Sequence, residues 1–427
     1  MTYVETWYSR RLGAASARLA LDGAFDAEAC VVGGGLAGLS TALELARTGR
    51  RVCVLEARRI AWGASGRNGG FVSPGYSAGW RTLSQRVGAA RAETLHRLSI
   101  EGVRAVADNI ETLGITAAAP VKGYLSASRH EATDDLLAYR DWAERTFDYP
   151  VAFWERDRVR EALRSDRYHQ GLHQPEAFHI DPLAYSLGLA AEIERLGGRV
   201  FEDSPAVSLS AGPGERRVAT ARGRVRADEV VIATGGYTGR WQSRLHASYL
   251  PVATYVMLTR PDGALIAEAI RTTAAIGDRR RAGDYYRLVQ GGERILWGGK
   301  ITTRTREPRD LARVLRASMV ATYPQLRGLE VDIAWSGLMA YARHLMPQVV
   351  RLVPGLWGCT AFGGHGVNTT AIAGRALAEA ITGQSDRIAA FAPFGLAWNG
   401  GLAGRLAVQG TYWALQVQDA FNERRAA

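Results

Sequence analysis

Two short apolar runs separated by a helical repeat begin the clearly patterned part of the chain. Residues 29–32 (Ala-Cys-Val-Val) and 51–56 (Arg-Val-Cys-Val-Leu-Glu) resemble parallel strands that are buried on both faces. Between them, residues 39–46 place leucines and alanines three and four positions apart, which is the period of a helix. This order predicts a strand–helix–strand unit and an α/β fold class.

The rest of the chain alternates between helical and strand-like stretches. Residues 81–147 carry helical periodicity, whereas strand-like runs dominate residues 249–301. A hairpin-like stretch at 216–227 leads into the apolar run 230–234. Further helices are expected at 181–196, 308–322 and 370–381. The pattern therefore predicts an α/β protein whose first domain is interrupted by other segments.

Composition is that of a globular protein with a basic surface. Of 427 residues, 53 are basic and 42 acidic, which gives a formal net charge of +11, and 47% are hydrophobic, which excludes wholesale disorder. The basic residues are arginines except Lys122 and Lys300, and either solvated surfaces or attraction of anionic partners accounts for them. Cys30, Cys53 and Cys359 lie in apolar surroundings, which favours reduced thiols and a cytoplasmic location. No membrane span, signal peptide or metal-binding spacing is expected.

The first strand and helix are joined by a glycine-rich turn with the spacing of a dinucleotide-binding site. Gly33 allows the tight turn, Gly35 lets the backbone approach a pyrophosphate, and Gly38 lets the helix pack closely on the strand. The helix N-terminus adds unpaired N–H groups and a partial positive charge. Glu56 ends the second strand, where its carboxylate can accept hydrogen bonds from a ribose.

Three later segments favour FAD over NAD as the dinucleotide. Residues 63–70 (Gly-Ala-Ser-Gly-Arg-Asn-Gly-Gly) follow the second strand, and such a run can pack its backbone against a flat ring. Residues 230–235 form a strand that ends in a turn of small residues, able to pass close to a ribose or pyrophosphate. Residues 363–366 (Gly-Gly-His-Gly) begin a helix whose positive end could stabilise an anionic reduced flavin.

These segments resemble the glycine oxidase, sarcosine oxidase and D-amino-acid oxidase family, and within it the branch of gamma-glutamylputrescine oxidoreductases. The resemblance covers nearly the whole chain and includes residues 63–70, 179–183, 284–288 and 364–367. It implies a glutathione-reductase-type FAD-binding Rossmann domain with an inserted antiparallel-sheet substrate domain. The expected division assigns residues 1–80, 181–245 and 346–427 to the FAD-binding domain and residues 81–180 and 246–345 to the substrate domain.

The resemblance also implies how the cofactor is held. Sarcosine oxidases bind flavin covalently through a cysteine two residues before a tyrosine, and Met339 occupies that place before Tyr341, so FAD is expected to be noncovalent. Asn368 stands where a lysine is expected after the final His-Gly pair, which disfavours an N-methyl amino acid. The expected FAD contacts are Gly33, Gly35, Leu36, Ala37, Gly38, Glu56, Ala57, Arg58, Ala64, Ser65, Gly66, Arg67, Asn68, Gly69, Gly70, Val207, Ala233, Thr234, Gly235, Gly363, Gly364, His365, Gly366, Val367 and Asn368.

Four residues are candidates for the chemistry itself. Lys300 matches the lysine that helps oxygen react in sarcosine oxidases, although an exposed lysine at a strand end is the alternative. His365 either bonds flavin or substrate or packs at a helix start. Tyr286 and Tyr341 either line the substrate pocket with aromatic faces or pack in the core.

The resemblance implies flavin-dependent oxidation of an amine C–N bond. The substrate would be a primary or secondary amine, a polyamine derivative or an amino acid. The imine product would hydrolyse to a carbonyl compound and an amine, while O2 is reduced to H2O2. The alternatives are a dehydrogenase that passes electrons to another acceptor and, on the basic charge alone, an FAD-containing RNA-modifying or nucleic-acid-binding protein, although nucleic acid is not the expected partner. The amphipathic C-terminal stretch 412–421 is expected to pack on the protein rather than on a membrane surface.

Overall fold

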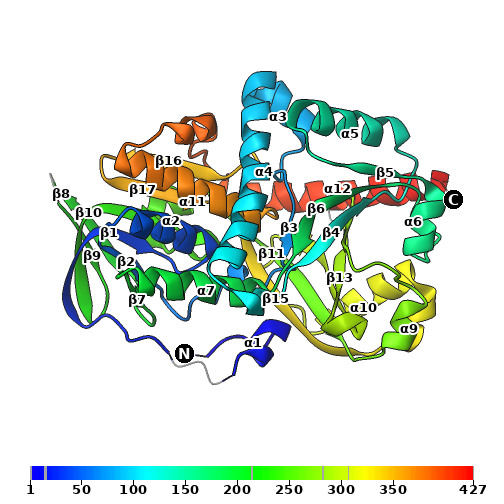
Figure 1. The fold of residues 1–427 in the computed structure, drawn as a ribbon, viewed down its shortest axis with the longest axis horizontal. Coiled ribbons are helices and arrows are strands. Elements are labelled where there is room, and N and C mark those ends of the chain that lie inside the picture. The colour runs from blue at the N-terminus through cyan, green and yellow to red at the C-terminus, as the bar shows by residue number, and fades with distance from the viewer. Residues whose placement is uncertain (1, 14–16, 213–214, 281–282, 306, 427) are drawn as a thin grey trace.

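The fold places two β-sheets side by side with helices around them (Figure 1). The computed structural model describes residues 2–13, 17–212, 215–280, 283–305 and 307–426. Within these residues the first sheet has eight strands and the second has nine, and segments from distant parts of the chain alternate between them. The predicted α/β class with an FAD-binding domain and a second sheet is confirmed.

The first sheet is built around the predicted strand–helix–strand unit. Its central strands β10, β1, β2 and β7 run parallel, as expected for strands buried between helices. The strand order is β16 (Gln348–Val353), β17 (Leu356–Thr360), β10 (Gly223–Ile232), β1 (Gly23–Val32), β2 (Val52–Leu55) and β7 (Arg199–Phe201). The strand β9 (Glu215–Ala219) pairs with β10 in the hairpin predicted at 216–227, and β8 (Ser208–Gly212) pairs with β9.

Helices α2 (Leu36–Arg47), α7 (Pro182–Arg195) and α11 (Gly366–Thr382) pack together on this sheet. Glycine permits the closest approach, because a Cβ at Gly374 of α11 would lie 2.7 Å from the backbone nitrogen of Thr41 in α2. The long helix α4 (Ala89–Thr112) also packs on α11, through Gly102, where a Cβ would overlap the carbonyl oxygen of Asn368. Residues of the segment 81–180 thus contribute to the same core as the glycine-rich turn.

The second sheet is largely antiparallel and carries its own hydrophobic core on one face. Its order is β15 (Val331–Ala342), β11 (Tyr249–Thr259), β14 (Arg294–Thr302), β13 (Tyr285–Val289), β12 (Ala275–Asp278), β4 (Val121–Ala127), β6 (Gly171–His179) and β3 (Phe71–Val72), with β5 (Ala152–Trp154) beside β6. The one parallel pair along this path joins β12 to β4.

One helical prediction needs correction. The stretch 81–147 contains α3 (Trp80–Val87), α4 and α5 (Thr133–Phe147), but β4 lies between them. In β4 alternate residues are buried, which is the period of a strand. The strand is short and lies between two long helices, so its pattern was not separated from theirs. The helices expected at 181–196, 308–322 and 370–381 are confirmed as α7, α10 (Leu311–Thr322) and α11.

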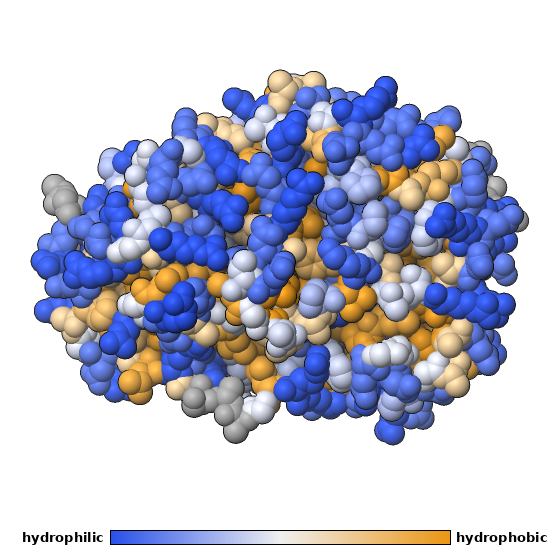
Figure 2. Space-filling model, in the orientation of Figure 1, coloured by the Kyte–Doolittle hydropathy of each residue, from blue (hydrophilic) through white to orange (hydrophobic). Residues whose placement is uncertain are grey.

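The other helices of the described residues are short, except for the last one. They are α1 (Trp7–Arg11), α6 (Arg156–Ala162), α8 (Ser243–His246), α9 (Gly263–Ala267) and α12 (Gly401–Ala426). The face drawn in Figure 2 is mostly hydrophilic, with hydrophobic side chains in smaller areas between the charged ones. Among the described residues, we find no helix with both the length and the apolar character needed to cross a bilayer.

Candidate functional site

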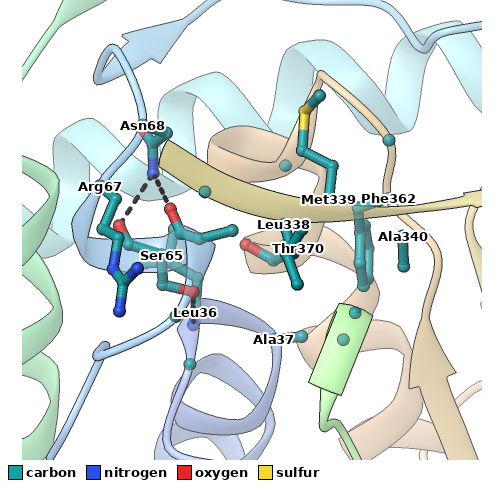
Figure 3. A pocket seen from close by; sticks show the side chains of 18 of the residues that line it. Leu36, Ala37, Ser65, Arg67, Asn68, Leu338, Met339, Ala340, Phe362 and Thr370 are labelled. Carbon is teal, nitrogen blue, oxygen red and sulfur yellow. Dashed lines mark hydrogen bonds between the residues drawn. The ribbon is translucent and has the colours of Figure 1, made fainter. Parts of the chain in front are cut away.

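A cavity of about 660 Å³ lies between the two sheets and receives most of the predicted cofactor residues. One end is formed by the turn after β1, the end of β2 and the 3₁₀ turn η1 (Ala64–Gly66). The other end is formed by strands β13 and β15 and by the start of α11. Figure 3 shows Leu36 and Ser65 at one side of this cavity and Met339 and Phe362 at the other.

The glycine-rich turn has the geometry that the sequence predicts. Gly33 has a φ of +117°, and a Cβ there would lie 2.5 Å from the carbonyl oxygen of Ala233. A Cβ at Gly38 would overlap the carbonyl oxygen of Gly33, so helix α2 can meet the turn only through a glycine. Gly35 precedes α2 and has no side chain to cap the helix; the N–H of Leu36 donates to Ser65 Oγ, and Ala37 in the same first turn lines the cavity.

Glu56 is fixed at the cavity wall by the backbone around it. Its carboxylate accepts hydrogen bonds from the N–H of Gly34 at 2.7 Å and from the N–H of Arg58 at 2.9 Å. Burial raises the pKa of this carboxyl, and the two backbone hydrogen bonds oppose that effect. The side chain therefore ties the glycine-rich turn to the end of β2 and also faces the space available to a ribose.

The segment 63–70 is a rigid wall of the cavity rather than an open loop. Asn68 donates from Nδ2 to the carbonyl oxygens of Ala64 at 3.0 Å and Ser65 at 2.8 Å, as the dashed lines in Figure 3 show. Its Oδ1 accepts from the N–H of Gly70 at 2.7 Å. Ser65 Oγ accepts from the N–H of Leu36 at 2.9 Å, which joins this wall to the start of α2.

Arg67 carries a donor that has no partner among the described residues. Its Nε donates to the carbonyl of Trp62 at 2.7 Å, and Nη1 donates to the carbonyl of Ser336 at 3.3 Å. The buried Nη2 makes no hydrogen bond. Burial lowers the pKa of Arg67, so an additional acceptor would stabilise its charge. An unpaired buried donor beside a glycine-lined cavity fits a polar cofactor such as FAD.

The opposite end of the cavity combines aromatic and titratable side chains. Met339, Tyr341, Phe362 and His365 all line it, so the structure brings together two of the predicted catalytic candidates. Burial raises the pKa of Tyr341 and lowers that of His365, which favours the neutral form of both. The start of α11 also faces the cavity, as expected for a helix end near the flavin.

The structure corrects the expectation for Tyr286. This side chain is fully buried in the core of the second sheet, where it stacks on Trp297 with a centroid distance of 4.2 Å. Its hydroxyl bonds with those of Tyr323 at 2.7 Å and Tyr168 at 3.1 Å. Successive residues of a strand face opposite sides of the sheet, so the preceding Tyr285 lines the cavity instead.

Lys300 also lies apart from the lining residues. The pairing of β11 with β14 shifts register here, since Thr254 opposes Ile301 whereas Tyr255 opposes Gly299. Lys300 is the extra residue of this irregularity and has a φ of +57°. Because the irregularity redirects the side chains, Ile301 reaches the cavity and Lys300 does not.

Four predicted contacts do not line the cavity, for identifiable reasons. Gly38, Gly66 and Gly70 lie against neighbouring backbone and act through close packing, as a Cβ at each would meet a carbonyl group. Val207 is 53% exposed, and its neighbours Pro205 and Ala206 line the cavity instead. All other predicted contacts do line it.

Several residues that line the cavity were not predicted from the sequence. The missed residues include Trp62, Tyr124, Tyr237, Thr254, Asp278, Arg280, Asp284 and Tyr285. Half of these lie in strands of the second sheet, where alternation alone does not say which face meets the cofactor domain. Asp278 and Asp284 form a buried ion-pair cluster with Arg129 and Arg280, in which Arg280 lies 2.9 Å from both carboxylates.

Comparison with known proteins agrees with this geometry. The sequence is 34% identical to gamma-glutamylputrescine oxidoreductase of Escherichia coli over 367 residues, covering 86% of each chain. It is 32% identical to a probable oxidoreductase, OrdL, of Haemophilus influenzae over 372 residues, covering 86% of this chain and 85% of that one. The glycine oxidase structure from Geobacillus kaustophilus superimposes with a TM-score of 0.73 at 20% identity, covering 87% of this chain and 99% of the other.

The family model described as FAD dependent oxidoreductase matches residues 28–380, which include both sheets and nearly all of the cavity wall. Its cofactor, FAD, fits the glycine-rich turn, Glu56 and the unpaired donor of Arg67. The enzymatic class is therefore oxidation of amine or amino-acid C–N groups. The chain belongs to the family of FAD-dependent oxidoreductases that includes glycine oxidase and gamma-glutamylputrescine oxidoreductase.

Proposed function

We propose that the protein oxidises an amine whose reacting carbon carries no carboxylate, with noncovalent FAD as cofactor and oxygen as electron acceptor. The proposed substrate class rests on where the positively charged side chains lie around the cavity. Among the described residues, the arginines and lysines that line the cavity are Arg58, Arg67 and Arg280. None belongs to β15, which carries Tyr341, or to α11, which begins directly after His365, so we expect a carboxylate beside these two residues to lack a cationic partner.

The second sheet offers features that suit an extended amine. Tyr285, Tyr341 and Phe362 supply aromatic surface for an alkyl chain. Asp278 and Asp284 line the cavity farther along the sheet, although Arg129 and Arg280 balance much of their charge. The relative named for gamma-glutamylputrescine supports a polyamine derivative as the substrate.

Bound FAD supplies the two-electron acceptor for the reaction. Burial lowers the pKa of His365, so its imidazole is neutral near pH 7 and can hydrogen-bond the uncharged amine, the form in which the substrate reacts. The amine then loses two electrons and two protons in forming the imine, and water converts the imine to a carbonyl compound and the free amine or ammonia. With oxygen as acceptor, the same electrons and protons give hydrogen peroxide.

Anaerobic reduction of the flavin tests the substrate class directly. Diamines and their γ-glutamyl derivatives should bleach the oxidised-flavin band, because their reacting carbon bears no carboxylate. Glycine and sarcosine serve as matched carboxylate-bearing amines and should bleach it at least about tenfold more slowly, the cost of one unpaired buried charge contact. Faster bleaching by glycine or sarcosine would contradict the proposal.

Oxygen is proposed as the acceptor because relatives named glycine oxidase match up to 86% of the chain. The placement of Lys300 outside the cavity lining favours a second candidate, a dehydrogenase that uses another acceptor. Oxygen consumption matched by peroxide formation during turnover supports the oxidase. Turnover with an artificial dye but without oxygen uptake supports the dehydrogenase.

Lys300→Met is expected to change flavin reoxidation by oxygen less than about threefold. A charge accelerates superoxide formation strongly only when it faces the reacting ring in a dry site, and Lys300 does not line the cavity. Stopped-flow mixing of reduced enzyme with oxygen measures this rate. Slowing by about a hundredfold, with unchanged reduction by substrate, would place the ammonium group at the flavin after all.

Acid precipitation should release the flavin into the supernatant. Covalent attachment in sarcosine oxidases uses a cysteine thiol, whereas the thioether of Met339 lines the cavity here and cannot form that bond. Absorption spectra of pellet and supernatant after precipitation measure the partition. Yellow colour retained in the washed pellet would contradict noncovalent binding.

A reducing compartment, the cytoplasm, is proposed for the protein. Cys30 and Cys53 are paired in register on neighbouring strands, yet both are free thiols, as is Cys359. All three are buried. Such thiols persist where glutathione keeps cysteines reduced, which supports this location.

A further inference from the structure

The N-terminal helix α1 reaches the cavity wall that residues 63–70 form. Tyr8 of α1 is 1% exposed, and its hydroxyl donates to the carbonyl oxygen of Asn68 at 2.7 Å. Its ring meets Trp335 edge-on with a centroid distance of 6.2 Å, and the indole N–H of Trp335 donates to the carbonyl of Arg67 at 2.8 Å. Neither Tyr8 nor Trp335 lines the cavity. Two successive carbonyl groups of the wall, next to the side chains drawn in Figure 3, are therefore held by buried residues outside the lining.

A buried guanidinium group lies behind Tyr8. Arg287 of β13 is 5% exposed, and its Nη2 donates to the hydroxyl of Tyr8 at 3.1 Å and to the carbonyl of Ile180 at 2.8 Å. Its Nη1 donates to Nδ1 of His179 at 2.8 Å. Burial, and then the charge of Arg287, lower the pKa of His179 to about 3, so this imidazole is neutral. Of these residues, Arg287 alone is charged.

The charge of Arg287 is not balanced by an acid in direct contact. Within the described part of the chain its hydrogen bonds go to neutral groups, and its buried Nε makes none. Asp181 caps α7 and lies 3.4 Å from Arg11. Burial raises the pKa of Asp181, and the hydrogen bonds of the cap and the charges of Arg11 and Arg287 oppose this effect. A buried charge polarises the group to which it donates, so Arg287 makes the hydroxyl of Tyr8 a stronger donor to Asn68.

This chain of hydrogen bonds ends on the peptide group that joins Asn68 to Gly69. A trans peptide group points its carbonyl and its N–H in opposite directions, and the described residues contain no cis peptide bond. Because the carbonyl of this group faces Tyr8, its N–H faces away from Tyr8. Gly69 lines the cavity, and its N–H makes no hydrogen bond with the described residues. A hydrogen bond to the carbonyl of a peptide group also makes its N–H a better donor.

We propose that Tyr8 and Arg287 are positioning residues for the flavin ring, because they direct the N–H of Gly69 at an acceptor atom on the edge of that ring. The ring nitrogens and carbonyl oxygens of flavin are such acceptors, and reduction adds electron density to them. A donor fixed in the protein interior stabilises that density more than water does. The network therefore raises the reduction potential of FAD. The family model begins at residue 28, so the role of Tyr8 lies outside the segment that it matches.

The reduction potential of the bound FAD, measured by equilibration with a reference dye, tests the proposal without any amine substrate. Tyr8→Phe keeps the ring beside Trp335 but removes the donor to Asn68, so the ratio of reduced to oxidised flavin at a fixed potential should fall at least about threefold. Arg287→Met also removes the charge and should lower this ratio at least about tenfold, or about 30 mV for a two-electron couple. Both variants should still bind FAD, because neither residue lines the cavity.

Tyr3→Phe is the matched control. The hydroxyl of Tyr3 donates to the carbonyl of Ile60 at 2.9 Å, so this variant loosens the same N-terminal segment without changing a contact of residues 63–70, and it should leave the potential unchanged. The proposal is overturned if Tyr8→Phe has the potential of the unchanged protein, or if Tyr3→Phe shifts it equally. Loss of FAD by Tyr8→Phe would also overturn it, because Tyr8 would then be needed to hold the nucleotide rather than to orient one donor.

Discussion

Gly38→Val should yield protein that retains less than about one-tenth of the normal FAD, the largest effect expected of any single substitution in the nucleotide site. A Cβ at this position would overlap the carbonyl oxygen of Gly33 and come within 3.1 Å of Val31. Neither obstacle is the end of a flexible side chain, so helix α2 must move away from the turn. The phosphate-binding N–H groups would move with it. Flavin absorbance relative to protein absorbance after purification measures the loss.

Gly79→Ala is the matched control for that substitution. Gly79 precedes α3 in an extended conformation, and a Cβ there meets nothing within 4 Å. This variant should keep its full FAD content and thermal stability. If Gly38→Val retains FAD as well as Gly79→Ala does, close contact between α2 and the turn is not what forms the nucleotide site.

Glu56→Ala should weaken FAD binding by about 1–3 kcal/mol, or roughly ten- to hundredfold in dissociation constant. The carboxylate holds the N–H groups of Gly34 and Arg58 and faces the cavity, so its removal loosens the turn and deletes a ribose acceptor. Titration of the apoprotein with FAD, followed by flavin fluorescence, gives the constant for each variant.

Glu56→Gln separates the two roles of this side chain. An amide oxygen can still accept from one backbone N–H, so the local fold should be preserved, while the charged acceptor for the ribose is lost. We expect its FAD affinity to fall between those of the unchanged protein and Glu56→Ala. Equal FAD affinity in all three proteins would show that the side chain at position 56 does not contribute to FAD binding.

Local sequence was sufficient to predict the geometry of the glycine-rich turn at one end of the cavity. Gly33, Gly35 and Gly38 are close together in the chain, and at each of them a Cβ would come too close to a neighbouring atom at the turn between β1 and α2. Glu56 comes directly after the four-residue strand β2, so it lies at the carboxyl end of that strand. Such motifs specify geometry because all their parts belong to one strand–helix–strand unit.

The other end of the cavity, where we propose that the substrate binds, could not be predicted in the same way, because it is assembled from separate strands. Tyr285 and Tyr286 are adjacent and chemically alike, and only the placement of the sheet decides which one faces the cavity. For Lys300, one irregular pairing between β11 and β14 reverses the direction of a side chain. Neither the side of the sheet nor the irregularity is encoded in the residues nearby.

The parallel sheet of the FAD-binding domain also constrains when the protein can fold during synthesis. Strand β1 pairs with β10, where Val32 opposes Ile232, and β10 pairs with β17, where Ile232 opposes Gly358. Helix α11, which lies near the C-terminal end of the sequence, packs on α2. Because the ribosome releases these partners in order, the glycine-rich turn emerges hundreds of residues before the elements that enclose it. The nascent chain must keep its first apolar strands from aggregating until α11 has left the ribosome, a demand typical of proteins rich in long-range contacts.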